Sequence, residues 1–295
     1  MAELIEVSDV VATALADNKP VVALETTLVA HGFPAPDGVA VGLESERQVR
    51  AAGAVPATVG VLDGAIRVGL SKDELARFTP EARKLGPRDL ATCVVQGAVG
   101  ATTVGCTLSV ARSLGIRFLG TGGLGGVHRG FPSPPDVSAD LRELARSPAL
   151  VVASGVKSLL DVPATMEVLE TLGVPVLGWQ TESLPLFYSA DGGPPVSARI
   201  ETTAQAAAIA TSHWRLGGAG LLLGNPPPES IDVEHLIEEA LAEAGHRGVA
   251  GQGVTPFVLS YLHERSGGET LRVNRLLIAA NAGLAARIAV AHGAL

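Results

Sequence analysis

Short apolar runs alternate with amphipathic segments along most of the 295-residue chain. The runs have the length of buried strands, and the segments between them have the apolar spacing of helices. We predict strands at 21–24, 116–120, 149–155, 174–180 and 220–225, and helices at 37–53, 71–78, 101–115, 136–147, 163–173, 202–217, 231–246 and 272–292. Continuous apolar strands separated by helices are typical of a largely parallel sheet covered on both faces.

Local signals refine this pattern. The segment 57–69 reads as a hairpin that turns at Asp63-Gly64, so the sheet should be mixed. Ser71 and Glu74 have the spacing of a capping box. Asp37 is a possible N-cap of the helix at 37–53, and Asp136 or Ser138 of the helix at 136–147. Because no repeat, low-complexity tract or charged linker interrupts the chain, we predict one three-layer α/β/α domain over residues 1–295 with a mixed, largely parallel central sheet.

Composition narrows the class of protein. With 47% hydrophobic and 18% charged residues the chain is not disordered, and a net charge of −8 without a basic stripe argues against nucleic-acid binding. Two cysteines and an acidic N-terminal segment, which lacks the bases of a signal peptide, predict a cytoplasmic protein. The apolar stretch 276–295 contains Asn281, Arg287 and His292, so we expect a packed core helix and no membrane span.

Ligands of such sheets bind beyond the carboxyl ends of the strands, so polar residues that follow predicted strands are the candidates for chemistry. Glu25 directly follows the run 21–24. Partial desolvation raises the pKa of a carboxyl in such a place and suits a general acid, although a solvated strand-end residue or a helix cap is the simpler alternative.

Lysine is scarce: the chain has 18 arginines but only four lysines, at positions 19, 72, 84 and 157. Lys157 follows an apolar strand through a small-residue turn. A desolvated lysine is a neutral nucleophile for Schiff-base chemistry, which arginine cannot perform. The alternative is a lysine that extends to solvent at the end of a strand.

Two further segments carry candidate ligand-binding groups. In the segment 120–130, three glycines fit the dinucleotide fingerprint G-x-G-x-x-G, but prolines 132, 134 and 135 precede the next helix, so a loop that closely approaches a ligand is favoured. His128 and Arg129 in this loop could reach an anion or be solvated. Asp136, Ser138 and Asp140 suit either helix capping or a hard divalent cation.

These segments together resemble the pseudouridine-5′-phosphate glycosidase family, also called the indigoidine synthase A-like family. The resemblance rests on ALETTLVAHGFP (23–34), GAVPATVGVLDGAIRVGLSKDEL (53–75), KLGPRDL (84–90), GATTVGCT (100–107), TGGLGGVHRG (121–130), DVSADL (136–141), SGVKSLLD (154–161), GVPVLGWQT (173–181), NPPPE (225–229) and NAGLA (281–285). It covers nearly the whole chain.

The resemblance implies an α/β/α enzyme, a pseudouridylate synthase, that reversibly cleaves the C–C glycosidic bond of pseudouridine 5′-phosphate to uracil and ribose 5-phosphate in pseudouridine catabolism. It also implies one Mn²⁺ per subunit and a homotrimer. Glu25 resembles the family proton donor, Lys157 its nucleophile, and Asp136 its metal ligand, with Asp140 as the alternative ligand. Positions that resemble substrate contacts are Lys84, Val104, Ser138, Ala139 and Asp140, and His128 and Asn281 resemble further pocket residues.

Two other functions use the same residues. A lysine aldolase acting on a phosphosugar would also form a Schiff base on the lysine, but it would release a carbonyl fragment instead of uracil. A non-catalytic sugar-phosphate sensor would bind without turnover and would not need an uncharged Lys157.

Overall fold

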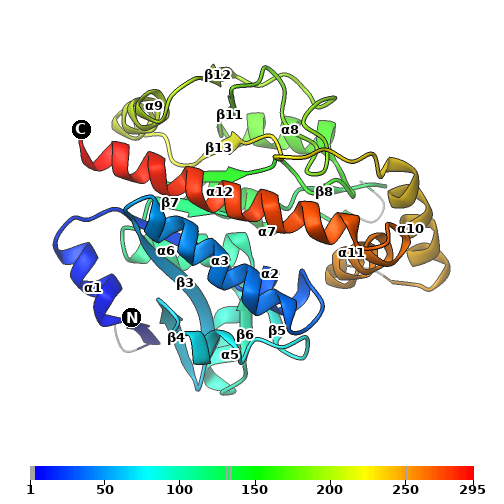
Figure 1. The fold of residues 1–295 in the computed structure, drawn as a ribbon, viewed down its shortest axis with the longest axis horizontal. Coiled ribbons are helices and arrows are strands. Elements are labelled where there is room, and N and C mark those ends of the chain that lie inside the picture. Colours follow the sequence, from blue (N-terminus) through cyan, green and yellow to red (C-terminus); the bar gives the residue numbers. More distant parts are fainter. Residues whose placement is uncertain (1–3, 131, 133–134, 250) are drawn as a thin grey trace.

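The computed structural model describes residues 4–130, 132, 135–249 and 251–295, which form one α/β fold (Figure 1). Pro134, one of the prolines that separate the glycine-rich segment from the next helix, lies outside these residues. The strands are β1 (Ile5–Val7), β2 (Val21–Leu24), β3 (Val55–Leu62), β4 (Ala65–Val68), β5 (Arg83–Leu85), β6 (Gly100–Thr102), β7 (Phe118–Gly120), β8 (Val127–His128), β9 (Leu150–Ala153), β10 (Leu160–Asp161), β11 (Val176–Trp179), β12 (Ala198–Ile200) and β13 (Leu221–Gly224).

Eleven of these strands form the central sheet, in the order β1-β4-β3-β2-β7-β9-β13-β11-β12, with β6 paired to β3 and β5 paired to β6. Neighbours are parallel except for the pairs β3/β4 and β3/β6, which are antiparallel. The predicted hairpin is the β3–β4 pair. Asp63 and Gly64 both have positive φ, 52° and 76°, as a two-residue turn that matches strand twist requires. The prediction of a mixed, largely parallel sheet is confirmed.

Both faces of the sheet are buried, because neighbouring residues of a strand point to opposite faces. Along β2, Val21 and Ala23 belong to one hydrophobic cluster, whereas Val22 and Leu24 belong to a second. Strands β9 and β13 alternate in the same way. The second cluster includes residues of α3, α9 and α12, so these helices cover one face, and the remaining helices contribute to the first cluster. The predicted three-layer arrangement follows from this alternation.

The helices are α1 (Asp9–Ala16), α2 (Thr27–His31), α3 (Asp37–Ala51), α4 (Lys72–Leu75), α5 (Leu90–Val95), α6 (Val104–Ser113), α7 (Ala139–Leu144), α8 (Val162–Thr171), α9 (Thr203–Arg215), α10 (Glu234–His246), α11 (Val254–Arg265) and α12 (Glu269–Gly293). The capping box of Ser71 and Glu74 is confirmed, although the helix is one turn long. The prediction of Asp37 as an N-cap is wrong: Pro36 precedes the helix and Asp37 is its first residue. At α7 the cap is Ser138, whose hydroxyl accepts from the Asp140 N–H, and Asp136 lies before the helix.

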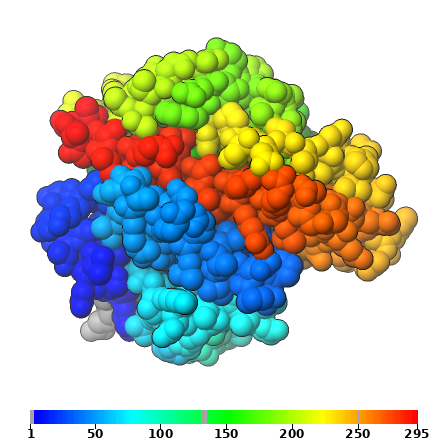
Figure 2. All heavy atoms as spheres, in the orientation of Figure 1, coloured from blue at the N-terminus to red at the C-terminus, as the bar shows by residue number. Residues whose placement is uncertain are grey.

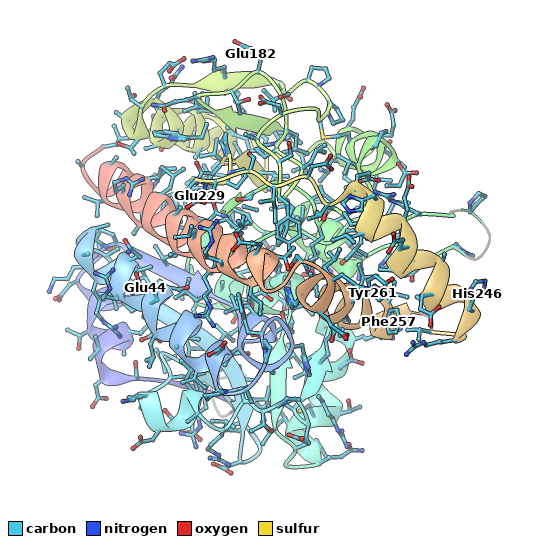
Figure 3. All side chains as sticks on the ribbon, turned by 45° about the vertical axis from the view of Figure 1, so that its right-hand side comes forward. Glu44, Glu182, Glu229, His246, Phe257 and Tyr261 are labelled. Atoms are coloured by element: carbon cyan, nitrogen blue, oxygen red, sulfur yellow. The ribbon has the colours of Figure 1, made fainter. Side chains whose placement is uncertain are left out.

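The described residues after β13 form three α-helices, and not the predicted two. Helix α11 was not predicted, and it packs against α10, where the Tyr261 hydroxyl donates to Glu239 and the Arg247 guanidinium lies 5.5 Å from the centre of the Phe257 ring (Figure 3). Acidic side chains such as Glu182 and Glu229 project from the outer surface (Figure 3).

Helix α12 crosses the molecule as a band between its blue and its green parts (Figure 2). By length and composition it is the one described helix that could cross a membrane, but its inward face is packed on the sheet and against α3 and α9. The predicted core helix is confirmed, and it begins three residues earlier than expected.

Candidate active site

The predicted acid and nucleophile line one cavity at the carboxyl ends of two parallel strands, β2 and β9, which flank β7. Glu25 follows β2 directly, and Thr121 follows the adjacent strand β7. Lys157 comes four residues after the end of β9, which pairs with the other side of β7. The loop with Lys157 is bonded to the segment that follows β7, where the Lys157 N–H donates to the Leu124 carbonyl over 3.1 Å. Sheet order therefore brings these residues together.

Glu25 is a buried carboxyl, with only 4% of the residue exposed. The Thr27 and Thr121 hydroxyls donate hydrogen bonds to its two oxygens. Burial raises the pKa of Glu25, and the opposing effects of the Lys157 charge and these hydrogen bonds are smaller. A carboxyl whose pKa is raised retains its proton closer to neutral pH, as a general acid must.

Two cavities adjoin Lys157. The inner cavity, of about 60 Å³, is lined by Glu25, Lys84, Lys157 and mostly apolar residues. The outer cavity, of about 370 Å³, is polar and is lined by Lys84, Lys157, Arg88, Arg142 and residues 136–140. Lys84 and Lys157 line both cavities and so mark the boundary between them.

Lys84 lies on β5, a strand that was not predicted. Burial and the positive charge of Lys157 lower the pKa of Lys84 to about 8, against the opposing effect of Asp140, Glu25 and Asp136. A lysine with such a pKa begins to lose its proton near neutral pH. Small changes in its surroundings therefore change the fraction of the side chain that carries a positive charge.

Asp140 is buried, and it fixes the backbone around the outer cavity. One carboxylate oxygen accepts from the Gly105 N–H at the start of α6 over 2.7 Å, and the other accepts from the Gly125 N–H over 3.0 Å. A Cβ at Gly125 would lie 2.3 Å from the Ser138 hydroxyl, so only glycine allows this approach. Ser138, Ala139 and Asp140 line the outer cavity as one segment, whereas Val104 is fully buried in the first turn of α6.

Asp136 and His128 lie next to each other in the wall of the outer cavity, with 3.9 Å between a carboxylate oxygen and Nδ1. Burial lowers the pKa of His128, although Asp136 opposes this. The described residues contain no group of three or more His, Cys, Asp or Glu that could hold a metal ion. Because Asp136 is partly exposed and Asp140 is occupied by backbone donors, the arrangement fits a hard cation held by Asp136 together with water and substrate oxygens.

Asn281 of α12 lies behind the site, where it is fully buried. Its amide donates to the Thr121 carbonyl over 2.7 Å and to the Ser154 hydroxyl over 3.1 Å, and its oxygen accepts from Asn225 over 2.9 Å. Asn281 therefore holds the segment after β7 to the end of β9, and it is not among the described residues that line either cavity.

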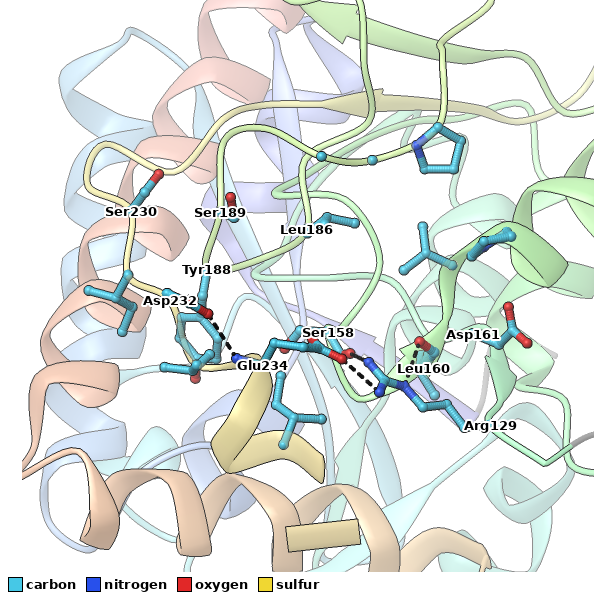
Figure 4. A pocket seen from close by; sticks show the side chains of 18 residues that line it. Arg129, Ser158, Leu160, Asp161, Leu186, Tyr188, Ser189, Ser230, Asp232 and Glu234 are labelled. Atoms are coloured by element: carbon cyan, nitrogen blue, oxygen red, sulfur yellow. Dashed lines mark hydrogen bonds and ion pairs between the residues drawn. The ribbon is translucent and has the colours of Figure 1, made fainter. Parts of the chain in front are cut away.

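Another cavity, of about 870 Å³, lies beside the 158–163 segment and is lined by none of the three residues Glu25, Lys84 and Lys157 (Figure 4). Arg129 lies here. It forms an ion pair with Glu234 at 2.8 Å and donates to the Ser158 carbonyl over 2.9 Å (Figure 4). Of the two basic residues in the glycine-rich segment, His128 lines the outer cavity, and Arg129 lines neither of the two cavities at Lys157.

Several residues of the inner cavity were not predicted as site residues: Thr27, His31, Thr121, Phe187, Thr255 and Asn274. Thr27 and His31 lie just after Glu25, so their proximity to it could have marked them. Asn274 is seven residues before Asn281, two turns earlier on the same face of an apolar helix. That spacing is the one signal in the sequence that could have indicated Asn274.

Fold and site define an α/β enzyme in which two lysines and one buried carboxyl share a cavity at one end of a mixed, largely parallel sheet. The chain belongs to the indigoidine synthase A-like family, whose model, described as "Indigoidine synthase A like protein", matches residues 10–291.

Relatives with assigned names agree with this membership. Pseudouridine-5′-phosphate glycosidase of Herpetosiphon aurantiacus is 46% identical over 99% of this chain and 98% of its own length. The enzyme of the same name from Streptomyces griseus is 48% identical over 95% of this chain and 90% of its own.

Two solved structures share the fold. The prealnumycin C-glycosynthase AlnA, in complex with ribulose 5-phosphate, superimposes with a TM-score of 0.90 at 38% identity, covering 99% of this chain and 98% of that one. An indigoidine synthase A-like protein from Thermotoga maritima has a TM-score of 0.88 at 38% identity, covering 97% of this chain and 96% of that one.

Proposed function

We propose that this protein reversibly cleaves the C–C glycosidic bond of pseudouridine 5′-phosphate, giving uracil and ribose 5-phosphate. The position of Lys157 carries the proposal: it lies at the boundary between an apolar inner cavity and a polar outer cavity. A substrate with its base in the inner cavity and its sugar phosphate in the outer one places the bond between them at Lys157. The names of the relatives at 46% and 48% identity support the substrate.

The inner cavity also argues for chemistry unlike that of common glycosidases, which use two carboxyl groups and release an oxygen leaving group. Glu25 is the one carboxyl among the described residues that line it, and two lysines accompany it. A lysine nucleophile divides the cleavage of a C–C bond into easier covalent steps.

The proposed steps use the residues as follows. Glu25 gives its proton to the ribose ring oxygen as the bond from that oxygen to C1′ opens, and the Lys157 amine forms a bond to C1′. The nitrogen of Lys157 releases a proton once it is bonded to C1′, and Glu25, which is now a carboxylate, takes this proton and gives it to the base carbon attached to C1′. The electrons of the C–C bond then pass to the base, which leaves as uracil. Ribose remains on Lys157 as an iminium ion, and water hydrolyses it to ribose 5-phosphate and the free amine.

The other predicted residues have supporting roles in this proposal. Lys84 binds the phosphate or a polarised oxygen as a compact cation. Ser138, Ala139, Asp140 and the backbone near Val104 contact the sugar phosphate, and His128 lines the same cavity. Asp136 would hold Mn²⁺, which supplies positive charge to substrate oxygens when bound. Asn281 acts indirectly, by holding the segment after β7 in place.

We further propose a cytoplasmic homotrimer with one Mn²⁺ per subunit that acts in pseudouridine catabolism. Light scattering coupled to gel filtration gives the mass of the assembly, and metal analysis of Asp136→Ala against the unmodified protein tests the metal ligand.

The decisive assay follows uracil release from pseudouridine 5′-phosphate in the presence of Mn²⁺. We expect turnover by the unmodified protein and none by Lys157→Arg, because arginine keeps the charge but is not a nucleophile. Borohydride reduction with ribose 5-phosphate, followed by peptide mass mapping, should place a sugar adduct on Lys157. Release of a carbonyl fragment without uracil would indicate an aldolase, and an adduct on another residue would refute the imine step.

A further inference from the structure

Two polar side chains that line the inner cavity have a buried atom without a hydrogen-bond partner among the described residues. They are Asn274 on α12, through its Oδ1 atom, and His31 at the end of α2, through Nε2. Asn274 is only 3% exposed. Nearly all buried polar atoms in proteins are paired, so two such atoms in one small cavity indicate that something else supplies the partners.

The nearby Asn281 is the contrast. It lies on the same face of α12, two turns further on, and its amide is hydrogen-bonded to Thr121, Ser154 and Asn225. Asn274 and Asn281 therefore differ in their surroundings: Asn281 is bonded within the protein, and Asn274 lines the inner cavity with an Oδ1 atom that has no partner among the described residues.

The walls between these polar atoms are apolar and closely spaced. Phe187 and Ile278 lie against the glycine backbone after β7: a Cβ at Gly123 would be 2.6 Å from the Phe187 ring, and one at Gly122 would be 3.1 Å from Ile278. Leu28, Phe33 and Leu259 line the cavity as well. Apolar walls with a few fixed polar groups are how proteins hold a planar ring in one orientation.

We propose that Asn274 and His31 recognise the base of the substrate, by binding the edge of a planar heterocycle in which ring N–H groups alternate with carbonyl groups. This rests on the proposed function, in which that heterocycle is uracil. The Asn274 oxygen accepts from one ring N–H while its amide donates to the adjacent carbonyl. The Nε2 atom of His31 accepts from a second ring N–H.

The charge state of His31 agrees with this role. Burial, and then the positive charge of Lys84, lower the pKa of His31. The imidazole is therefore neutral at neutral pH, and a neutral imidazole has one nitrogen that accepts a hydrogen bond.

The reverse reaction tests the proposal, because it uses the base and the sugar phosphate as separate substrates. We expect Asn274→Ala to raise the KM for uracil about tenfold to a hundredfold, the effect of leaving a buried ligand group unpaired. The KM for ribose 5-phosphate and the yield of its borohydride trapping on Lys157 should stay within about twofold of the values for the unmodified protein, because the substitution does not touch the sugar-phosphate site. His31→Leu should act in the same direction. Leu276→Ala, on the solvent side of α12, is the matched control and should change neither KM.

A methylated base identifies the hydrogen bond itself. The unmodified protein should strongly prefer uracil to 3-methyluracil, which lacks one ring N–H, and Asn274→Ala should lose most of that preference. An unchanged KM for uracil, an equal rise in both KM values, or loss of trapping in Asn274→Ala would overturn the assignment of the base.

A second measurement separates this inference from the proposed function. If the unmodified protein makes no pseudouridine 5′-phosphate, the proposed function fails, and uracil binding measured by saturation-transfer NMR still tests the inner cavity. Binding that Asn274→Ala and His31→Leu abolish supports recognition of the heterocycle. No binding to the unmodified protein, or equal binding to all three proteins, overturns it.

Discussion

Lys84 should make phosphate affinity depend on pH in the neutral range. Its pKa is lowered from 10.5 to about 8 by burial and by Lys157, which corresponds to roughly 3 kcal/mol of lost preference for the charged form. The ammonium group is then about 90% charged at about pH 7 and about 10% charged at about pH 9. If the ammonium binds the phosphate, affinity is present below this pKa and is lost as the pH rises through it, by about tenfold over that interval.

The assay is the inhibition constant of ribitol 5-phosphate, which has no carbonyl group and cannot form an imine with Lys157. We expect the constant to rise with pH in the unmodified protein and to be flat in Lys84→Arg, because a guanidinium group stays charged throughout. Lys72→Arg, at an exposed position of α4, is the matched control and should keep the slope. A flat profile in the unmodified protein, or the same slope in Lys84→Arg, would refute phosphate binding by Lys84.

Three further substitutions test the site and its support. Because the pKa of Glu25 is raised in the folded protein, the protein loses stability as the pH rises above 4.5. Glu25→Gln should therefore abolish turnover but raise the free energy of unfolding at neutral pH by about 1 kcal/mol, and this gain should disappear in acid. Asn281→Ala leaves Asn225 and other buried groups unpaired, so urea unfolding should show a loss of about 2–4 kcal/mol. Gly120→Ala would place a Cβ 2.8 Å from the Ala282 backbone, and thermal denaturation should show a lower Tm, with a shift of at least several degrees. An unchanged melting curve in either of the last two variants would contradict the packing described.

The central strands of the sheet could be predicted from the sequence, because continuous apolar runs such as 21–24 and 149–155 indicate buried strands without any knowledge of their neighbours. The sequence misses β5, in which Leu85 is the only apolar residue, because that strand exists through its pairing with β6, fifteen or more residues away. It also misses α11, whose third residue is Pro256. Proline is tolerated in a first turn but reads as a breaker in a sequence.

The same limit applies to the site. Glu25 and Lys157 follow predicted strands, so their place at one edge of the sheet could be predicted from topology. The separate roles of Asn274 and Asn281 could not, because both are asparagines on one face of one helix. Only the partners around each amide distinguish a residue bonded within the protein from one that faces a cavity.

Helix α12 has a consequence for biosynthesis. It covers one face of β2, β7 and β9, although it is translated after all of them. Until α12 has left the ribosome and docked, the part of that face that it covers stays bare, and neither Asn274 nor Asn281 is in place. Before α12 docks, the nascent chain therefore has no complete active site, and the apolar residues that α12 will cover are a natural target for chaperones.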